Sequence, residues 1–287
     1  MLATILTAAG SAALFGSADF MAGLASRRIP AVVVTAISYA VGLAVVGAVA
    51  LLSPPMTVNG PDLAFSAVSS VTGVVGVVTL YAAFATGRLS IVAPLTAGIS
   101  AAGPALFDIA RGARLSVLSI SGLVLAIVAV VVVSAGHAPR EGGARPTRAI
   151  ALAVVSGVSF AISIVALSLV GHAAGLAPLL MQRVLGTAAL VPVALWLVFA
   201  RSRPSSRRPD RRTLAMAGTV GVVDATAMIV LLLSIRLGPL AVASVISGLY
   251  PVVTIVLAHF ILEERMTVAE RVGITMALGA VVLTALA

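Results

Sequence analysis

Residues 247–279 read SGLYPVVTIVLAHFILEERMTVAERVGITMALG. They contain an apolar helix, a short charged hinge and the start of a second apolar helix. An earlier segment repeats this layout, because residues 91–122 can be laid over residues 242–273 by adding 151 to each number. The offset pairs Arg114 with Arg265 and Gly122 with Gly273. A repeat of this length indicates a chain made of two related halves.

The composition indicates that most of the chain faces lipid or other buried helices. Hydrophobic residues make up 61% of the sequence and charged residues 9%, and the mean hydropathy is +1.20. A soluble domain carries about a quarter charged residues, so this chain cannot cover itself with a water-facing surface. We therefore expect a protein whose main partner is the lipid bilayer.

Charge and cysteine content narrow the function classes. The formal net charge is +9, but all 18 positive residues are arginines, and almost all of them lie in short gaps between apolar segments. They form no basic face with interleaved aromatics, so nucleic acid is not an expected partner. The chain has no cysteine and three scattered histidines, and we expect neither a metal site nor a cofactor.

The apolar segments predict an all-α membrane protein with ten transmembrane helices. Crossing about 30 Å of hydrocarbon as a helix takes about 20 apolar residues, and ten segments qualify. The predicted spans are Leu2–Ala25, Val32–Leu52, Leu63–Ala85, Ile91–Ala110, Leu115–Ala135, Ala149–Val170, Leu176–Ala200, Leu214–Ile235, Leu240–Leu262 and Met266–Ala287.

Ten spans divide into two repeats of five, at residues 1–136 and 149–287, joined by a loop at 137–148. Five is odd, so the second repeat must enter the membrane upside down relative to the first, as in inverted-repeat transporters. Odd-numbered loops hold most of the arginines, including six at 201–212. The positive-inside rule then places odd-numbered loops in the cytoplasm and both termini outside.

With these features the chain resembles the ten-helix EamA-type branch of the drug/metabolite transporter superfamily. The resemblance is strongest in the second half and covers nearly the whole length. In the second half it assigns motif or hinge positions to Pro251, Glu264, Arg265 and Gly273, and in the first helix to Gly16 after an aromatic residue. It implies that spans 1, 3, 4, 6, 8 and 9 line a central cavity, with spans 5 and 10 at the periphery.

The first half departs from the family pattern. Ala113 stands where the hinge glutamate is expected, Ser100 stands at the position that matches Pro251, and Ser38 stands where a second-helix arginine could be. The two halves are therefore not expected to contribute equivalent site residues.

Ionisable residues inside the spans are the leading site candidates, because a charge at mid-bilayer costs about 3 kcal/mol on insertion scales. Asp224 lies near the middle of its span and is a candidate for proton coupling or for binding a substrate cation. Alternatively, it forms a structural pair with Arg183 or is a lone protonated acid. Arg183, which follows Gln182, could also hold a substrate carboxylate. Asp19 lies about two-thirds along the first span.

Two further residues occupy matching positions near the ends of their spans. For Asp108, with Arg111 three residues later, and for His259, with Glu263 four residues later, we favour local helix-end pairs over a functional role.

Two tyrosines combine an apolar ring with a polar group. Tyr250 directly precedes Pro251, which cannot donate a backbone hydrogen bond, so we expect a kink there beside small residues such as Ser247. Tyr81 is a further candidate for substrate contact. The candidate substrate-binding or coupling residues are Asp19, Tyr81, Gln182, Arg183, Asp224, Ser247 and Tyr250, and the hinge or motif residues are Gly16, Pro251, Glu264, Arg265 and Gly273.

The sequence lacks the motifs of hydrolases, metalloproteases and P-loop NTPases, so no enzymatic activity is expected. We predict a secondary active transporter that exports a small metabolite or amphiphilic compound across the cytoplasmic membrane by alternating access, with proton coupling as an option. The alternative is a non-transporting membrane protein, such as a lipid-handling enzyme or a scaffold subunit. Buried charges at a cavity would favour transport, and charges sealed or facing lipid would favour a scaffold.

Overall fold

The computed structural model describes residues 1–26, 28–86, 89–112, 116–135, 146–200, 210–262 and 267–285, and these residues form helices and short connections without a strand. The all-α prediction is therefore confirmed for this part of the chain. The α-helices are α1 (Leu2–Ser26), α2 (Ala31–Leu51), α3 (Gly60–Thr86), α4 (Leu89–Ala110), α5 (Val117–Ala135), α6 (Pro146–Ser168), α7 (Ala177–Ala200), α8 (Arg211–Leu237), α9 (Leu240–Ser247), α10 (Tyr250–Leu262) and α11 (Val268–Ala285). A short 3₁₀ helix, His172–Ala174, precedes α7.

Each of the ten predicted spans corresponds to a helix of the structure, and the ninth corresponds to α9 together with α10. By length and hydropathy, seven helical segments within the described residues can cross a membrane. Three shorter apolar segments lie in α4, α5 and α11, which are 22, 19 and 18 residues long.

Apolar side chains cover the outside of the bundle. On α3, Val68, Val71, Val75 and Val78 follow one face at helical spacing and are between 41% and 55% exposed. Exposed apolar stripes of this kind are unfavourable in water and favourable in hydrocarbon. The chain is therefore a multi-pass membrane protein.

The ninth predicted span is two helices and not one continuous helix with a kink. The helical pattern ends at Ser247, and α10 begins at Tyr250, one residue before Pro251. Pro251 has no N–H to donate to the Ser247 carbonyl, which explains why the break falls here. Gly248 allows the broken segment to approach α4, since a Cβ at this position would lie 2.9 Å from the Ala101 Cβ.

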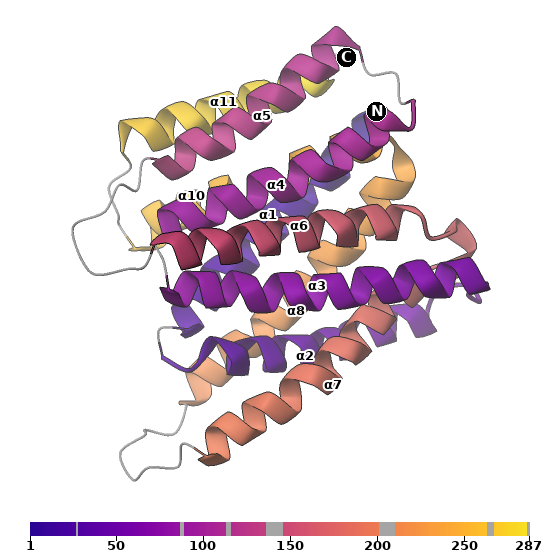
Figure 1. The fold of residues 1–287 in the computed structure, drawn as a ribbon, viewed down its shortest axis with the longest axis vertical. Coiled ribbons are helices and arrows are strands. Elements are labelled where there is room, and N and C mark those ends of the chain that lie inside the picture. The colour runs from indigo at the N-terminus through magenta and orange to yellow at the C-terminus, as the bar shows by residue number, and fades with distance from the viewer. Residues whose placement is uncertain are drawn as a thin grey trace.

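The helices form a layered bundle in which α5 and α11 pack together at one end and α2 and α7 lie at the other (Figure 1). The remaining helices lie between these two pairs. The expectation that the fifth and tenth spans are peripheral agrees with this arrangement.

Helices of the first half pack against the same partners as the matching helices of the second half, once every helix is replaced by its counterpart in the other half. Helix α1 packs against α8, as α6 packs against α3, and α2 packs against α8, as α7 packs against α3. Helix α4 packs against α6, as α9 and α10 pack against α1.

Side-chain hydrogen bonds show the same correspondence. Ser11 Oγ donates to the Ala227 carbonyl at 3.2 Å, and Ser156 Oγ donates to the Gly76 carbonyl at 2.8 Å. Ser156 follows Ser11 by 145 positions (156 − 11), and Ala227 follows Gly76 by 151 (227 − 76). The second offset equals that of the sequence repeat.

Partly buried hydrogen bonds join the loops on one side of the bundle. Asn59 and Asp62 cap the start of α3 reciprocally, each side chain accepting from the other's backbone N–H. Asp62 Oδ1 also accepts from the Gly171 N–H at 2.8 Å, and the Thr57 N–H donates to the Ala173 carbonyl at 2.9 Å. The loops that follow α2 and α6 are therefore held together.

Two more hydrogen bonds lie on this side, and the first of them shows that the predicted pair of Asp108 with Arg111 is wrong. Asp108 Oδ2 accepts from the Ala241 N–H at 3.0 Å, so this carboxylate caps α9 and is not paired with Arg111. The positive end of the α9 dipole and its free N–H groups explain why a carboxylate binds there. Arg236 Nη2 donates to the Gly175 carbonyl at 2.7 Å, which links the end of α8 to the loop before α7.

Candidate functional site

A cavity of about 170 Å³ lies in the middle of the bundle. Within the described residues, its lining side chains come from every α-helix except α5 and α11. The resemblance-based expectation left out the second and seventh spans, and this is corrected, because both contribute lining residues. The polar lining residues are Asp19, Thr35, Ser38, Tyr39, Ser100, Ser163, Gln182, Arg183, Asp224, Ser244, Ser247 and Tyr250.

An ion pair between α7 and α8 is the main electrostatic feature of the cavity. Arg183 Nη2 donates to Asp224 Oδ2 at 2.5 Å. The Arg183 side chain is 2% exposed, whereas that of Asp224 is 29% exposed. Of the alternatives for Asp224, the lone protonated acid is therefore wrong, and the pair with Arg183 is present.

The guanidinium group of Arg183 is held in place by α2. Its Cζ lies 4.9 Å from the centre of the Tyr39 ring, within the range of a cation–π contact. Tyr39 in turn fits against α7 at Gly186, where a Cβ would collide with the ring. A Cβ at Gly42 would lie 3.0 Å from Arg183 Nη1. Two glycines thus leave the space in which the guanidinium and the ring are stacked.

The second terminal nitrogen of Arg183 has no partner among the residues that the structure describes. Nη1 is buried and makes no hydrogen bond in the structure. Because the atom is inaccessible and faces Gly42, a ligand in the cavity cannot reach it without a rearrangement. The exposed part of the pair is the carboxylate of Asp224.

Gln182, the neighbour of Arg183, turns toward α3. Its side-chain amide fills the space beside Gly73, where an added Cβ would collide with Nε2. By the 151-residue offset, Gly73 is the counterpart of Asp224. The two halves therefore place different groups at matching positions of the cavity. This agrees with the expectation that the first half, which departs from the family pattern, does not contribute equivalent site residues.

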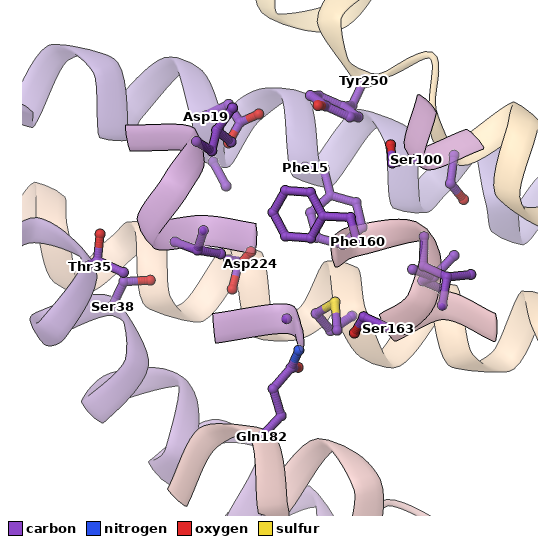
Figure 2. Close-up of a pocket in the computed structure, with 18 of the residues that line it drawn as sticks. Phe15, Asp19, Thr35, Ser38, Ser100, Phe160, Ser163, Gln182, Asp224 and Tyr250 are labelled. Atoms are coloured by element: carbon purple, nitrogen blue, oxygen red, sulfur yellow. The ribbon is translucent and has the colours of Figure 1, made fainter. Parts of the chain in front are cut away.

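Asp19 is the second carboxyl group of the cavity and differs from Asp224 in having no partner. It lies on α1 and has neither a hydrogen bond nor an ion pair with any residue that the structure describes. In the view of Figure 2, Asp19 and Tyr250 lie along one edge of the cavity, Phe15 and Phe160 at its centre, and Gln182 at the opposite edge.

Six of the seven predicted contact residues line this one cavity. They are Asp19, Gln182, Arg183, Asp224, Ser247 and Tyr250. Ser247 Oγ also donates to the Ala8 carbonyl at 3.4 Å, so part of its role is to join α9 to α1. Tyr81 lies in α3, but its side chain is outside the described part of the structure.

The predicted hinge and motif residues lie elsewhere. Glu264 and Arg265 fall outside the described residues. Pro251 marks the start of α10, and Gly273 is buried in the peripheral helix α11. Gly16 is a packing contact, because a Cβ there would lie 2.5 Å from the Tyr250 carbonyl oxygen at the start of α10.

Sequence reasoning missed several lining residues, of which Tyr39 is the most important. One signal was present: Ser38 was noted as the position where a second-helix arginine could be, and Tyr39 is its neighbour. Thr35 and Ser163 carried no signal, because small hydroxyl residues occur throughout the spans and usually bond to their own helix.

The geometry supports reversible binding of a small ligand in a partly polar chamber inside the membrane. It offers two carboxyl groups, hydroxyl groups and aromatic rings. Within the described residues, no group of three or more His, Asp or Glu side chains could hold a metal ion.

Comparisons with known proteins agree with this architecture. Residues 147–286 match the EamA-like transporter family. A crystal structure, titled only as that of a protein, superposes with a TM-score of 0.78 at 18% sequence identity, covering 99% of this chain and 98% of its own. At this identity, the similarity establishes the fold alone. No curated protein sequence matches the chain.

Proposed function

Because the chain belongs to the EamA-like transporter family of the drug/metabolite transporter superfamily, we propose that it is a secondary active transporter of small molecules in the cytoplasmic membrane. The observation that carries this proposal is the cavity, which lies between helices of both halves and holds an ion pair away from the lipid surface. Ionisable residues retained inside a membrane bundle mark substrate or ion pathways.

Alternating access requires two halves that can rock around a central site. We propose that residues 1–136 and 149–287 are inverted repeats that rock in this way. The exchangeable packing partners support this, as does a second pair of related hydrogen bonds. Thr96 Oγ1 donates to the Ala153 carbonyl, and Ser247 Oγ donates to the Ala8 carbonyl, at positions offset by 151 and 145 (247 − 96 and 153 − 8).

The proposed orientation has both termini outside and the odd-numbered loops in the cytoplasm. Hydrogen bonds that join the loops after α2, α6 and α8 support a common side for even-numbered loops. An exposed ion pair of 3.7 Å between Arg28 and Asp210 joins the first and seventh loops. Helix α11, the last described helix, ends on the same side of the bundle on which α1 begins (Figure 1).

We assign proton coupling to the Arg183–Asp224 pair. Protonation of Asp224 removes the charge that holds the guanidinium, so the pair can open in one protonation state and close in the other. An ion pair that breaks on protonation links proton uptake to the helix arrangement of α2, α7 and α8.

The experiment uses proteoliposomes loaded with a small-metabolite extract, with export measured by mass spectrometry of the external buffer. Compared with protein-free liposomes, we expect one or a few compounds to leave, faster when a pH gradient is imposed. Asp224→Asn should lose the gradient dependence, whereas Asp210→Asn, which removes an exposed carboxylate at the start of α8, should keep it. If no compound leaves faster than from protein-free liposomes, the transport proposal fails. If Asp224→Asn keeps the gradient dependence, the coupling role is wrong.

The alternative is a scaffold subunit or a lipid-handling enzyme. A scaffold has no use for charged groups at a central cavity, and a lipid-handling enzyme needs acid, base or metal groups gathered at one membrane face. The arrangement of Asp224 and Arg183 favours transport over both.

A further inference from the structure

The cavity offers a ligand negative charge and no accessible positive charge. Among the lining residues that the structure describes, Arg183 is the only cation, and its side chain is 2% exposed, bound to Asp224 and covered by the Tyr39 ring. A ligand carboxylate would therefore meet the carboxyl groups of Asp19 and Asp224 without a free guanidinium to bind it. Anionic ligands are disfavoured for this reason, including those that Arg183 was predicted to hold.

Asp19 has no counter-ion among the residues that the structure describes, so a cationic ligand is a partner that could keep its carboxylate charged. A carboxylate inside the bilayer is costly unless it is paired, and no residue described by the structure pairs with this one. The 2.5 Å bond of Asp224 to Arg183 shows how the second carboxyl group is satisfied. A ligand ammonium group would provide the same charge-assisted hydrogen bond for Asp19.

The surroundings of Asp19 suit the apolar part of such a ligand. Phe15 lies four residues earlier, on the same face of α1, and Phe160 of α6 also lines the cavity (Figure 2). The volume of about 170 Å³ is close to the roughly 150 Å³ of an engineered apolar cavity that binds benzene. The chamber therefore has room for about one six-membered ring with a short polar substituent.

We propose that the cavity binds small monocationic amines that carry a single apolar ring, with Asp19 as the counter-ion and Phe15 and Phe160 around the ring. This inference rests on the proposed function, because it names the substrate class of the same site. Asp19, and not the mid-span Asp224, then provides the carboxylate that recognises the ligand.

Binding of three ring compounds that differ in charge tests the proposal. Benzylamine is cationic at neutral pH, benzyl alcohol is neutral and benzoate is anionic. Each is titrated by calorimetry into the full-length protein in nanodiscs, with empty nanodiscs as the blank. We expect benzylamine to bind at least tenfold more tightly than either of the other two. Equal or tighter binding of benzoate or benzyl alcohol would overturn the proposal, as would the absence of benzylamine binding.

Variants then locate the counter-ion. Asp19→Asn should weaken benzylamine binding at least tenfold, Asp19→Glu should recover most of it, and Asp210→Asn should leave it unchanged. Unchanged binding in folded Asp19→Asn would show that this residue is not the counter-ion. If Asp19→Asn does not fold, the Asp19→Glu variant and the three-compound series on the wild type still decide the proposal.

The two proposals fail in different ways. If benzylamine does not bind but proteoliposomes export other metabolites, the amine inference is wrong and the transport function stands. If benzylamine binds at Asp19 but neither it nor any metabolite crosses the membrane, the site is correct and the transport function is wrong.

Discussion

Replacing Asp224 by Asn removes one negative charge from the cavity and leaves the side-chain volume almost unchanged. Arg183 is 1% exposed, and a guanidinium does not lose its proton in a protein, so its charge would stay buried without a counter-ion. Breaking a buried ion pair by removing one partner costs about 3–5 kcal/mol of folding stability. The Asp224 side chain is 29% exposed to the cavity, so we expect the lower end, about 3 kcal/mol.

Replacing Arg183 by Met should cost less, although it removes the larger side chain. The carboxyl group left behind can bind a proton and become neutral, which the guanidinium cannot do. The loss then consists mainly of the hydrogen bond and the contact with the Tyr39 ring, together about 1–2 kcal/mol. The double variant Arg183→Met/Asp224→Asn has no buried charge at this place and should be about as stable as Arg183→Met.

The assay is the free energy of unfolding of the four proteins in mixed micelles, titrated with a denaturing detergent and followed by circular dichroism. The cycle should give a coupling of about 2–3 kcal/mol, at the upper end for residues in contact. Two results would refute the claim that the buried guanidinium of Arg183 depends on the Asp224 carboxylate. One is a loss of less than about 1 kcal/mol of unfolding free energy in Asp224→Asn, and the other is a double variant whose loss equals the sum of the two single losses.

Three more changes test the packing and the loops. Gly16→Ala should lower the unfolding free energy by about 1–3 kcal/mol, because its Cβ would collide with a carbonyl oxygen, whereas Gly23→Ala, with no atom within 4 Å, should be neutral or stabilising. Asp62→Ala should cost about 2–3 kcal/mol in the same assay, since a buried carboxylate that accepts two backbone N–H bonds is lost. The Thr213 side-chain hydrogen bond, followed by its backbone N–H, lowers the pKa of Asp210 below its usual 3.8. The stability that the charged Asp210 contributes should be fully present above pH 3.8 and be lost as the pH falls through the lowered pKa. The unfolding midpoints of wild type and Asp210→Ala should therefore converge in acid.

Much of the fold could be predicted because membrane helices depend on local hydropathy. About 20 apolar residues in a row suffice to specify a span, and the ten predicted spans match the observed helices within a few residues. A kink in the ninth span was expected near Pro251 for an equally local reason, the missing N–H. Its form as two separate helices depends also on Gly248 and the neighbouring α4, which the local sequence does not describe.

The candidate site could be predicted only in part. Asp19, Arg183 and Asp224 are conspicuous in the sequence because charges inside apolar segments are rare and costly. Their roles remain predictions. Their meeting at one cavity could not be predicted, because it depends on the packing of helices that are far apart in the chain. Asp108 shows the limit of local reasoning, because its carboxylate binds the Ala241 N–H, 133 residues later, and not nearby Arg111.

The amino-acid order was enough to predict a helical membrane protein and to place a helix at each of ten predicted spans, because the transfer of each segment into lipid depends on the residues of that segment alone. The meeting of distant side chains had to come from the folded bundle. How α1, α2, α7 and α8 pack decides which carboxyl group pairs with Arg183, which one has no partner among the described residues, and where Tyr39 lies. That packing follows from shape complementarity between helices, including the spaces at Gly42 and Gly186, and no single segment encodes it.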